Sequence, residues 1–215
     1  MIVSVNMAQT IDGRSVRPEG RWFGLTSSND RKKMDLIRKN YAAVTCGMNT
    51  LLSDNPDFSV KSDIASSPIP VIFVTGRLPP LSLRVFNGPK KPILIYKNTY
   101  EKEIQSYLSV SHAYATSSFT PDTILSLLAS TGITSLLLEG GPTLNGLYFE
   151  ADLVDHIYVT MVPYLLGRGE GLMHGSIPGF AEKKWNLVSS EVKDDEIFLQ
   201  YCRRNKAVRY PPGDQ

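Results

Sequence analysis

The sequence is poor in cysteine and histidine, with two cysteines and three histidines in 215 residues. Cys46 and Cys202 lie far apart in the chain, which supports neither a disulfide framework nor a four-ligand zinc site. The histidines show no metal-ligand spacing, and no Gly-x-Ser-x-Gly elbow or catalytic cysteine context is present. We therefore expect no metal, and neither covalent catalysis nor metal-dependent hydrolysis.

Strong net charge and long apolar runs are also missing. The formal net charge of +2 gives no long-range field that would attract nucleic acid or an anionic membrane. No apolar run approaches the roughly 20 residues that span a bilayer, and the first residues lack the basic region and cleavage site of a signal peptide. We expect a cytoplasmic protein that binds a small molecule, with no nucleic-acid or membrane partner.

Short apolar runs alternate with helical patterns along the chain. Hydrophobic residues make up 42% of the sequence, which is enough for a substantial core. The patterns predict strands at residues 2–7, 42–46, 71–74, 92–96, 112–115, 136–138 and 153–162. They predict helices that end near residue 40 and that cover residues 49–54, 100–108, 121–131 and 142–150.

This alternation predicts an α/β fold with a mostly parallel central sheet flanked by helices. A terminal hairpin, formed by residues 185–190 and 197–202, would add antiparallel strands at one edge. Because no linker divides the chain, residues 1–203 are expected to form a single domain, and residues 204–215 a flexible tail.

The most informative local pattern is LLLEGGPTLNG, at residues 136–146. A buried strand leads into two glycines and then into a helix with Pro142 in its first turn. The free amides at such a helix start can bind a phosphate, although an empty tight turn explains the pattern equally well. The spacing differs from the GxGxxG dinucleotide motif. Glu139 ends the strand, where ligands bind in open α/β sheets, but a solvated carboxylate would look the same.

Other segments carry weaker signals when they are taken alone. Residues 47–56 (GMNTLLSDNP) follow a strand and contain a hydroxyl and a carboxylate, yet a capped short helix and turn is the simpler interpretation. Asp12-Gly13 indicates only a turn. Arg38 belongs to a basic helix face, and such faces are usually just solvated.

The order of these segments resembles a known family. The chain contains five separate segments in this order: A-x-T-I-D-G-R, L-T-S, G-M-N-T-L-L-S-D-N-P, L-L-L-E-G-G-P-T-L-N-G and L-V-D-H-I-Y-V-T-M-V-P-Y-L-L-G. It is similar, from about residue 3 to 169, to the reductase domain of the bacterial riboflavin-biosynthesis deaminase–reductase and its stand-alone archaeal and fungal relatives. The resemblance implies a dihydrofolate-reductase-like fold, an NADPH cofactor and a homodimer. It also implies reduction of the ribosyl group of 5-amino-6-(5-phosphoribosylamino)uracil to a ribityl chain.

The resemblance also implies roles for individual residues. Asp54 and Glu139 would be the catalytic candidates, Asp54 as a proton relay. The cofactor-binding positions would be Ala8, Thr50, Asp54, Thr75, Gly76, Gly140, Gly141, Pro142, Thr143, Leu144 and Asn145. The substrate-binding positions would be Trp22, Arg38, Phe58, Lys61 and Glu139, with Arg38 on the phosphate.

The chain departs from the family pattern at three places, and two of them, Lys61 and the loop of residues 21–24, bear on the substrate. Asn55 replaces a common second Asp, Lys61 replaces a common Arg, and the loop of residues 21–24 displaces the expected Trp. A same-fold reductase of a pterin or dihydrofolate-like compound is therefore an alternative, and a non-catalytic nucleotide-binding protein is a second one. These 215 residues lack the zinc deaminase motif, so they do not carry out the deamination step.

Overall fold

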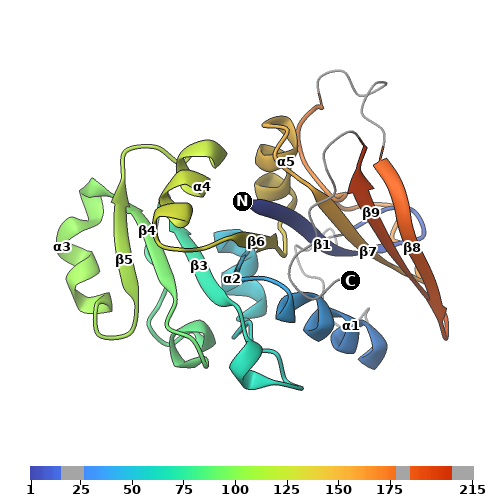
Figure 1. The fold of residues 1–215 in the computed structure, drawn as a ribbon, viewed down its shortest axis with the longest axis horizontal. Helices are drawn as coiled ribbons and strands as arrows, with labels where there is room; N and C mark the ends of the chain where they lie inside the picture. The colour runs from blue at the N-terminus through green and yellow to red at the C-terminus, as the bar shows by residue number, and fades with distance from the viewer. Residues whose placement is uncertain (16–26, 178–184, 205–215) are drawn as a thin grey trace.

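The computed structural model describes residues 1–15, 27–177 and 185–204 (Figure 1). These residues form a nine-stranded sheet in the order β5-β4-β3-β2-β6-β1-β7-β9-β8. The neighbours from β5 to β7 are parallel, whereas β9 runs antiparallel to both β7 and β8. The predicted α/β class, with its antiparallel hairpin at one edge, is confirmed.

The strands lie close to the predicted positions. They are β1 (Ile2–Thr10), β2 (Ala43–Thr45), β3 (Ile69–Val74), β4 (Ile93–Lys97), β5 (His112–Thr116), β6 (Ser135–Leu138), β7 (His156–Val162), β8 (Trp185–Lys193) and β9 (Glu196–Arg203). The helices are α1 (Ser28–Lys39), α2 (Met48–Asp54), α3 (Glu101–Ile104), α4 (Pro121–Ser130) and α5 (Pro142–Glu150). Short 3₁₀ helices are η1 (Ile64–Ser66), η2 (Arg84–Asn87), η3 (Asn98–Tyr100) and η4 (Gln105–Tyr107).

The predicted helix at residues 100–108 is helical in the structure up to residue 107, but it is not a single α-helix. The segment is divided into η3, the four-residue α3 and η4. The Ser106 hydroxyl donates to the Glu103 carbonyl at 2.8 Å, and such local side-chain bonds compete with the regular helical ladder. The first strand is also longer than predicted, because β1 stays paired with β7 as far as Thr10 and Val162.

Apolar side chains cover both faces of the sheet. Along β6, Leu137 points into one core with Ile37 of α1 and Leu51 of α2. Leu136 and Leu138 point into the other core, where α4 and α5 pack (Figure 1). This alternation follows from the two-residue period of a strand, and burial on both faces is typical of parallel sheets.

The first helix is fixed at its start by a polar contact with the terminal hairpin. The Ser27 side chain caps α1 by accepting from the backbone amides of Asn29 and Asp30. Ser27 also donates to the buried Glu196 carboxylate of β9, through its backbone amide at 2.9 Å and its hydroxyl at 2.6 Å. The antiparallel edge therefore helps to place α1 against the sheet.

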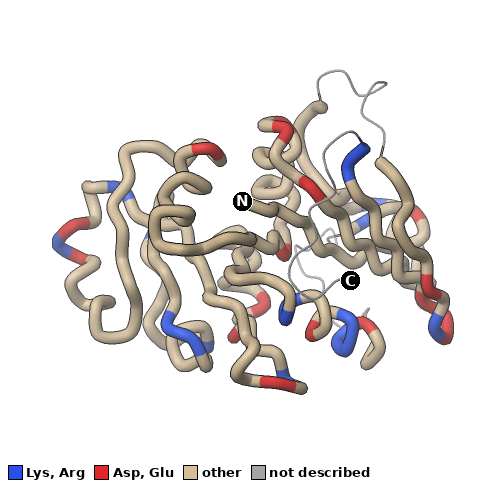
Figure 2. Tube along the Cα trace, in the orientation of Figure 1, with Lys and Arg blue, Asp and Glu red and all other residues tan. Residues whose placement is uncertain are grey.

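The surface carries both signs of charge interspersed along the elements (Figure 2). In the part of the chain that the structure describes, no helix is both long and apolar enough to cross a bilayer. The predicted tail at residues 204–215 lies outside the described residues from residue 205 onward. The division into domain and tail therefore stays a prediction.

Candidate functional site

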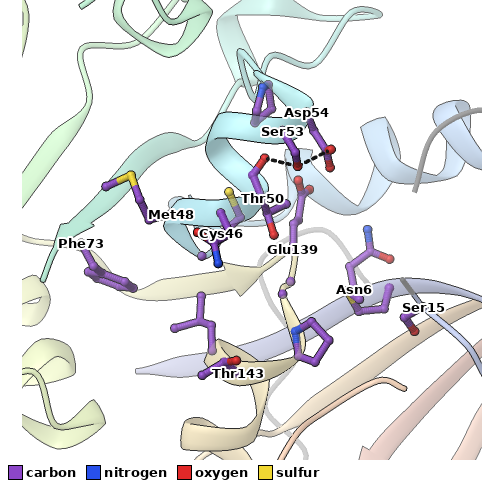
Figure 3. A pocket seen from close by; sticks show the side chains of 18 of the residues that line it. Asn6, Ser15, Cys46, Met48, Thr50, Ser53, Asp54, Phe73, Glu139 and Thr143 are labelled. Atoms are coloured by element: carbon purple, nitrogen blue, oxygen red, sulfur yellow. Dashed lines mark hydrogen bonds between the residues drawn. The ribbon is translucent and has the colours of Figure 1, made fainter. Parts of the chain in front are cut away.

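A large cavity opens at the carboxyl ends of the central strands. Its volume is about 1110 Å³, and residues within and after β1 and β3 line it together with residues after β2 and β6, which are here called its floor. Helices α1, α2 and α5 supply its walls (Figure 3). Ligand pockets commonly occupy about 300–1,000 Å³, so this one has room for a dinucleotide beside a second small molecule.

Two neighbouring strands enter the cavity through glycines. The Gly47 amide after β2 donates to the Gly140 carbonyl after β6 at 2.8 Å. Gly140 has a φ of +86°, and a Cβ on it would lie 2.8 Å from the Met7 sulfur. A Cβ on Gly141 would lie 3.2 Å from the Thr50 hydroxyl. Side chains at these glycines would press against Met7 and Thr50, and both glycines line the cavity, so a ligand can approach the backbone there without a side chain in between.

Helix α5 presents its start to this floor. Gly141 is its N-cap residue, no side chain caps it, and Pro142 occupies its first turn. The first intrahelical bond runs from the Asn145 amide to the Gly141 carbonyl. The amides of Thr143 and Leu144, which precede it, therefore have no intrahelical acceptor. Together with the helix dipole, they form an anion-binding position that side chains do not occupy.

Arg38 and Glu139 bind each other at the cavity wall. Arg38 Nε and Nη2 each donate to a Glu139 carboxylate oxygen at 2.7 Å, and Nη1 donates to the Ser59 carbonyl at 3.0 Å. Arg38 is only 6% exposed. Its burial works against the charged form, but the adjacent Glu139 carboxylate raises the Arg38 pKa overall. Much of the guanidinium fork predicted for phosphate is thus already committed to protein oxygens.

Phe58 and Lys61 follow α2, and the structure separates them. Phe58 has a φ of +54°, lines the cavity and lies under the Arg38 guanidinium, 5.7 Å from it. Lys61 is exposed, does not line the cavity and donates to Asp57 at 2.6 Å. Burial alone would raise the Asp57 pKa, but hydrogen bonds from Lys61 and Ser59 lower it overall. Lys61 therefore holds a turn in this structure instead of facing the cavity.

Helix α2 carries the other polar wall of the cavity. Ser53 donates to Asp54 at 2.7 Å and to the Thr50 carbonyl at 3.3 Å (Figure 3). Asp54 is exposed, and among the described residues no ion pair engages it. Cys46 also lines the cavity, but burial, and then the charges of Glu139 and Asp54, raise its thiol pKa well above the ordinary value. That thiol stays protonated and is a poor nucleophile.

The cavity gathers most of the predicted site residues. Those that line it are Ala8, Arg38, Thr50, Asp54, Phe58, Thr75, Gly76, Glu139, Gly140, Gly141, Pro142, Thr143 and Leu144. Asn145 does not line it, because its side chain is fully buried and donates to the Leu172 carbonyl at 2.9 Å. Trp22 and the rest of its loop lie outside the described residues.

The sequence interpretation missed several lining residues. Arg31, Arg77, Glu170 and His174 add charge or hydrogen-bonding groups, and Phe73, Phe119 and Ile124 add an apolar surface. Arg77 could have been suspected, because it directly follows Thr75 and Gly76 at the end of β3. Glu170 and His174 belong to a glycine-rich loop, which gives no local sign of where it packs.

Two buried hydroxyls on the lining lack partners. Ser15 Oγ and Tyr148 Oη have no hydrogen bond within the described residues. An unpaired buried hydroxyl costs free energy unless something bonds to it. A polar ligand in the cavity would satisfy both. Among residues 1–15, 27–177 and 185–204, no cluster of His, Cys, Asp and Glu side chains could hold a metal ion.

Comparison with known proteins decides the family. The sequence profile of the RibD C-terminal domain matches residues 1–199. The chain belongs to this family. Its fold and the order of its motifs agree with that assignment, and the predicted resemblance is confirmed.

Individual relatives are distant. The riboflavin biosynthesis protein RibD of Aquifex aeolicus is 28% identical over 78% of this chain and 48% of its own length, so the chain spans about half of that relative. The 2,5-diamino-6-ribosylamino-4(3H)-pyrimidinone 5′-phosphate reductase of Archaeoglobus fulgidus is 23% identical, over 98% of this chain and 94% of that protein.

Solved structures confirm the architecture. A Thermotoga maritima deaminase/5-amino-6-(5-phosphoribosylamino)uracil reductase superimposes with a TM-score of 0.81 and 25% identity, covering 94% of this chain and 56% of that one. Dihydrofolate reductase from Enterococcus faecalis gives a TM-score of 0.55 at 12% identity, over 95% and 97% of the two chains. The dihydrofolate-reductase-like fold is therefore shown.

We predict that the Arg38–Glu139 pair acts as one unit in stability. Arg38→Met or Glu139→Gln alone should lower the free energy of unfolding by about 3–5 kcal/mol, because each leaves a buried charge unpaired. The double variant should lose less than the sum of the two. Urea unfolding of the four proteins measures this coupling. Strictly additive losses would show that the two side chains are independent.

Proposed function

We propose that this chain is an NADPH-dependent reductase of a 6-ribosylaminopyrimidine 5′-phosphate, and that it acts in riboflavin biosynthesis. The observation that carries the proposal is the uncapped start of α5, which lies between glycines on the floor of a cavity large enough for two ligands. Membership of the RibD C-terminal domain family supports it, as do the names of the relatives that match along the chain.

The residues present fit NADPH. Gly140, Gly141 and the amides of Thr143 and Leu144 would hold its pyrophosphate, because they offer backbone donors without a side chain in the way. Thr50 borders this cradle, and the apolar wall of Phe73, Phe119 and Ile124 suits the adenosine. The unpaired Tyr148 hydroxyl faces the same cavity and would gain a partner there.

The substrate would occupy the half of the cavity between α1 and Glu139. The guanidinium of Arg38 and the carboxylate of Glu139, joined by two hydrogen bonds, form a flat polar surface for the substrate, and the guanidinium lies over the Phe58 ring. Arg31, exposed on the same helix, lines the cavity without a side-chain partner among the described residues, so it can bind a phosphate without losing a protein contact. Asn6 and the Ser15 hydroxyl border the same space.

When bound, NADPH supplies the hydride that adds to the imine carbon of the ring-opened ribosyl group, and the imine nitrogen bonded to that carbon must gain a proton. Asp54 is the best-placed group for that proton. Its carboxylate lines the cavity and accepts only the Ser53 bond among the described residues. Both Glu139 oxygens, by contrast, already accept from Arg38. We assign Glu139 to orientation of the substrate and Asp54 to holding and passing a proton at Oδ.

The activity test uses the absorbance of reduced nicotinamide. We expect NADPH to be oxidised when the chain meets 5-amino-6-(5-phosphoribosylamino)uracil or its 2-amino counterpart, and Asp54→Asn to lower kcat by about 10²-fold or more. A pterin serves as the control substrate. If the protein oxidised NADPH with the pterin but with neither pyrimidine, the proposed substrate would be wrong and the protein would be a pterin reductase. NADPH binding without any turnover would favour a non-catalytic protein.

Cofactor choice should depend on Arg77. This exposed arginine follows β3, lines the cavity and donates to Asn49 Oδ1 at 2.9 Å, so it is held ready for an anion. We propose that it binds the 2′-phosphate. Arg77→Ala should weaken NADPH binding by about 10–100-fold and leave NADH unchanged. Arg84→Ala, which removes another exposed arginine outside the lining, is the control. An equal loss for both cofactors would contradict the assignment.

We also propose that the chain is a cytoplasmic homodimer, as the family resemblance implies. Edge strand β8 exposes Leu187, Val188 and Val192, which are 54%, 39% and 72% exposed. Such an apolar edge strand is a ready surface for a second copy. Val192→Lys should shift the protein from dimer to monomer in sedimentation equilibrium, whereas Leu108→Lys, at the opposite end of the sheet, should not. A wild-type monomer would refute the dimer.

A further inference from the structure

The segment of residues 169–175, here called the strap, lies along helix α5. The His174 amide donates to the Pro142 carbonyl at 2.9 Å, and the Leu172 carbonyl accepts from the buried Asn145 side chain at 2.9 Å. At its other end, the Glu170 carbonyl accepts from the Ser15 amide at 2.7 Å. The strap is therefore attached both to the start of α5 and to the turn after β1.

A glycine inside α5 makes this close approach possible. A Cβ on Gly146 would overlap the His174 carbonyl. Glycine within a helix costs about 1 kcal/mol relative to alanine, and here it admits the strap backbone to the helix surface. The strap thereby carries His174 and Glu170 to the cavity lining, beside the position assigned above to the cofactor phosphates.

Three side chains form a chain of contacts at that point. His174 Nδ1 lies 3.0 Å from the Thr143 hydroxyl, and His174 Nε2 is paired with the Glu170 carboxylate. All three side chains are exposed on the cavity side. Because a carboxylate only accepts hydrogen bonds, Nε2 must carry a proton. The protonation of Nδ1 then decides which way the bond to Thr143 runs.

The direction of this bond controls what Thr143 can offer a ligand. With neutral His174, Nδ1 accepts, and the single hydroxyl proton of Thr143 is used by the imidazole. With charged His174, Nδ1–H donates to the Thr143 oxygen, and the hydroxyl proton is free to bond to an anion. A phosphate oxygen needs a donor, so it favours the second arrangement.

We propose that His174 and Glu170 are positioning residues for the cofactor: they orient the Thr143 hydroxyl, and NADP(H) binding at α5 takes up a proton at His174 Nδ1. The proton comes from solvent, and the Thr143 hydroxyl proton turns from His174 to a phosphate oxygen. The inference rests on the proposed function. Glu170 faces His174 from the strap. Glu150 faces the strap from α5 by accepting from the Ser176 amide, and Arg14 donates to the Gly169 carbonyl.

Calorimetric titration of the whole chain with NADP⁺ tests the proposal. Measurements in two buffers of different ionisation enthalpy give the number of protons taken up on binding. Between about pH 6 and 8, we expect the wild type to take up a fraction of a proton. Its affinity should fall by about tenfold as the pH rises across this range. Turnover is not needed for this measurement.

Matched variants isolate the His174 contribution. His174→Asn can still bond to Thr143 but cannot titrate, so it should lose the proton uptake, as should Thr143→Val. Thr143→Ser, which keeps the hydroxyl, should retain it. His112→Asn, an exposed histidine on edge strand β5, should behave as wild type. Thermal unfolding establishes that each variant is folded.

Two outcomes distinguish a failure of the His174 proposal from a failure of the proposed cofactor binding. Binding of NADP⁺ with the same proton uptake in wild type and His174→Asn would overturn the role of His174 and leave the proposed function standing. Failure of NADP⁺ to bind to any of the folded proteins at any pH would overturn the cofactor assignment, and this inference with it.

Discussion

The close approach of two strand ends determines how this site is built. The Gly47 amide after β2 reaches the Gly140 carbonyl after β6, and side chains at Gly140 and Gly141 would collide with Met7 and Thr50. Each strand then continues directly into a helix that begins at a glycine. This arrangement places backbone N–H and C=O groups, instead of apolar side chains, on the cavity floor.

The second constraint is the buried charge pair. An unpaired Arg38 or Glu139 charge would lower the stability of the fold at this largely buried wall. The pair is tolerated because the guanidinium donates hydrogen bonds to Glu139 and to the Ser59 carbonyl with good geometry. Phe58, held in the left-handed region at a φ of +54°, closes one side of it. The pair thus links α1 to the end of β6, and this wall of the cavity is shaped by a contact between residues about a hundred positions apart in sequence.

The regular elements could be predicted because their signals are local. Period-two apolar runs and Pro142 or Pro121 at a helix start are visible within a few residues, and the parallel order follows from the alternation of strands and helices. The helix at residues 100–108 was predicted, but its division into α and 3₁₀ turns was not, because side-chain bonds such as Ser106 to Glu103 compete with the regular helix in ways that propensity does not report. Within the site, family motifs identified the lining of α2 and α5. The mutual engagement of Arg38 and Glu139, the inward burial of Asn145 and the placement of His174 required the tertiary structure.

The distribution of charge along the cavity suits the two anionic ligands of the proposed reaction. Of its cationic groups, Arg38 is neutralised by Glu139, and His174 is engaged by Glu170. Arg31 and Arg77 are not in ion pairs within the described residues, and they come from α1 and from the end of β3, on either side of α2 (Figure 1). The start of α5 adds a third, uncharged anion position. Phosphates at three separated positions would each meet their own donor, and the repulsion between them falls with distance. A cavity with one dense cationic cluster would bind a single phosphate more tightly, but it would not place two substrates in a fixed order.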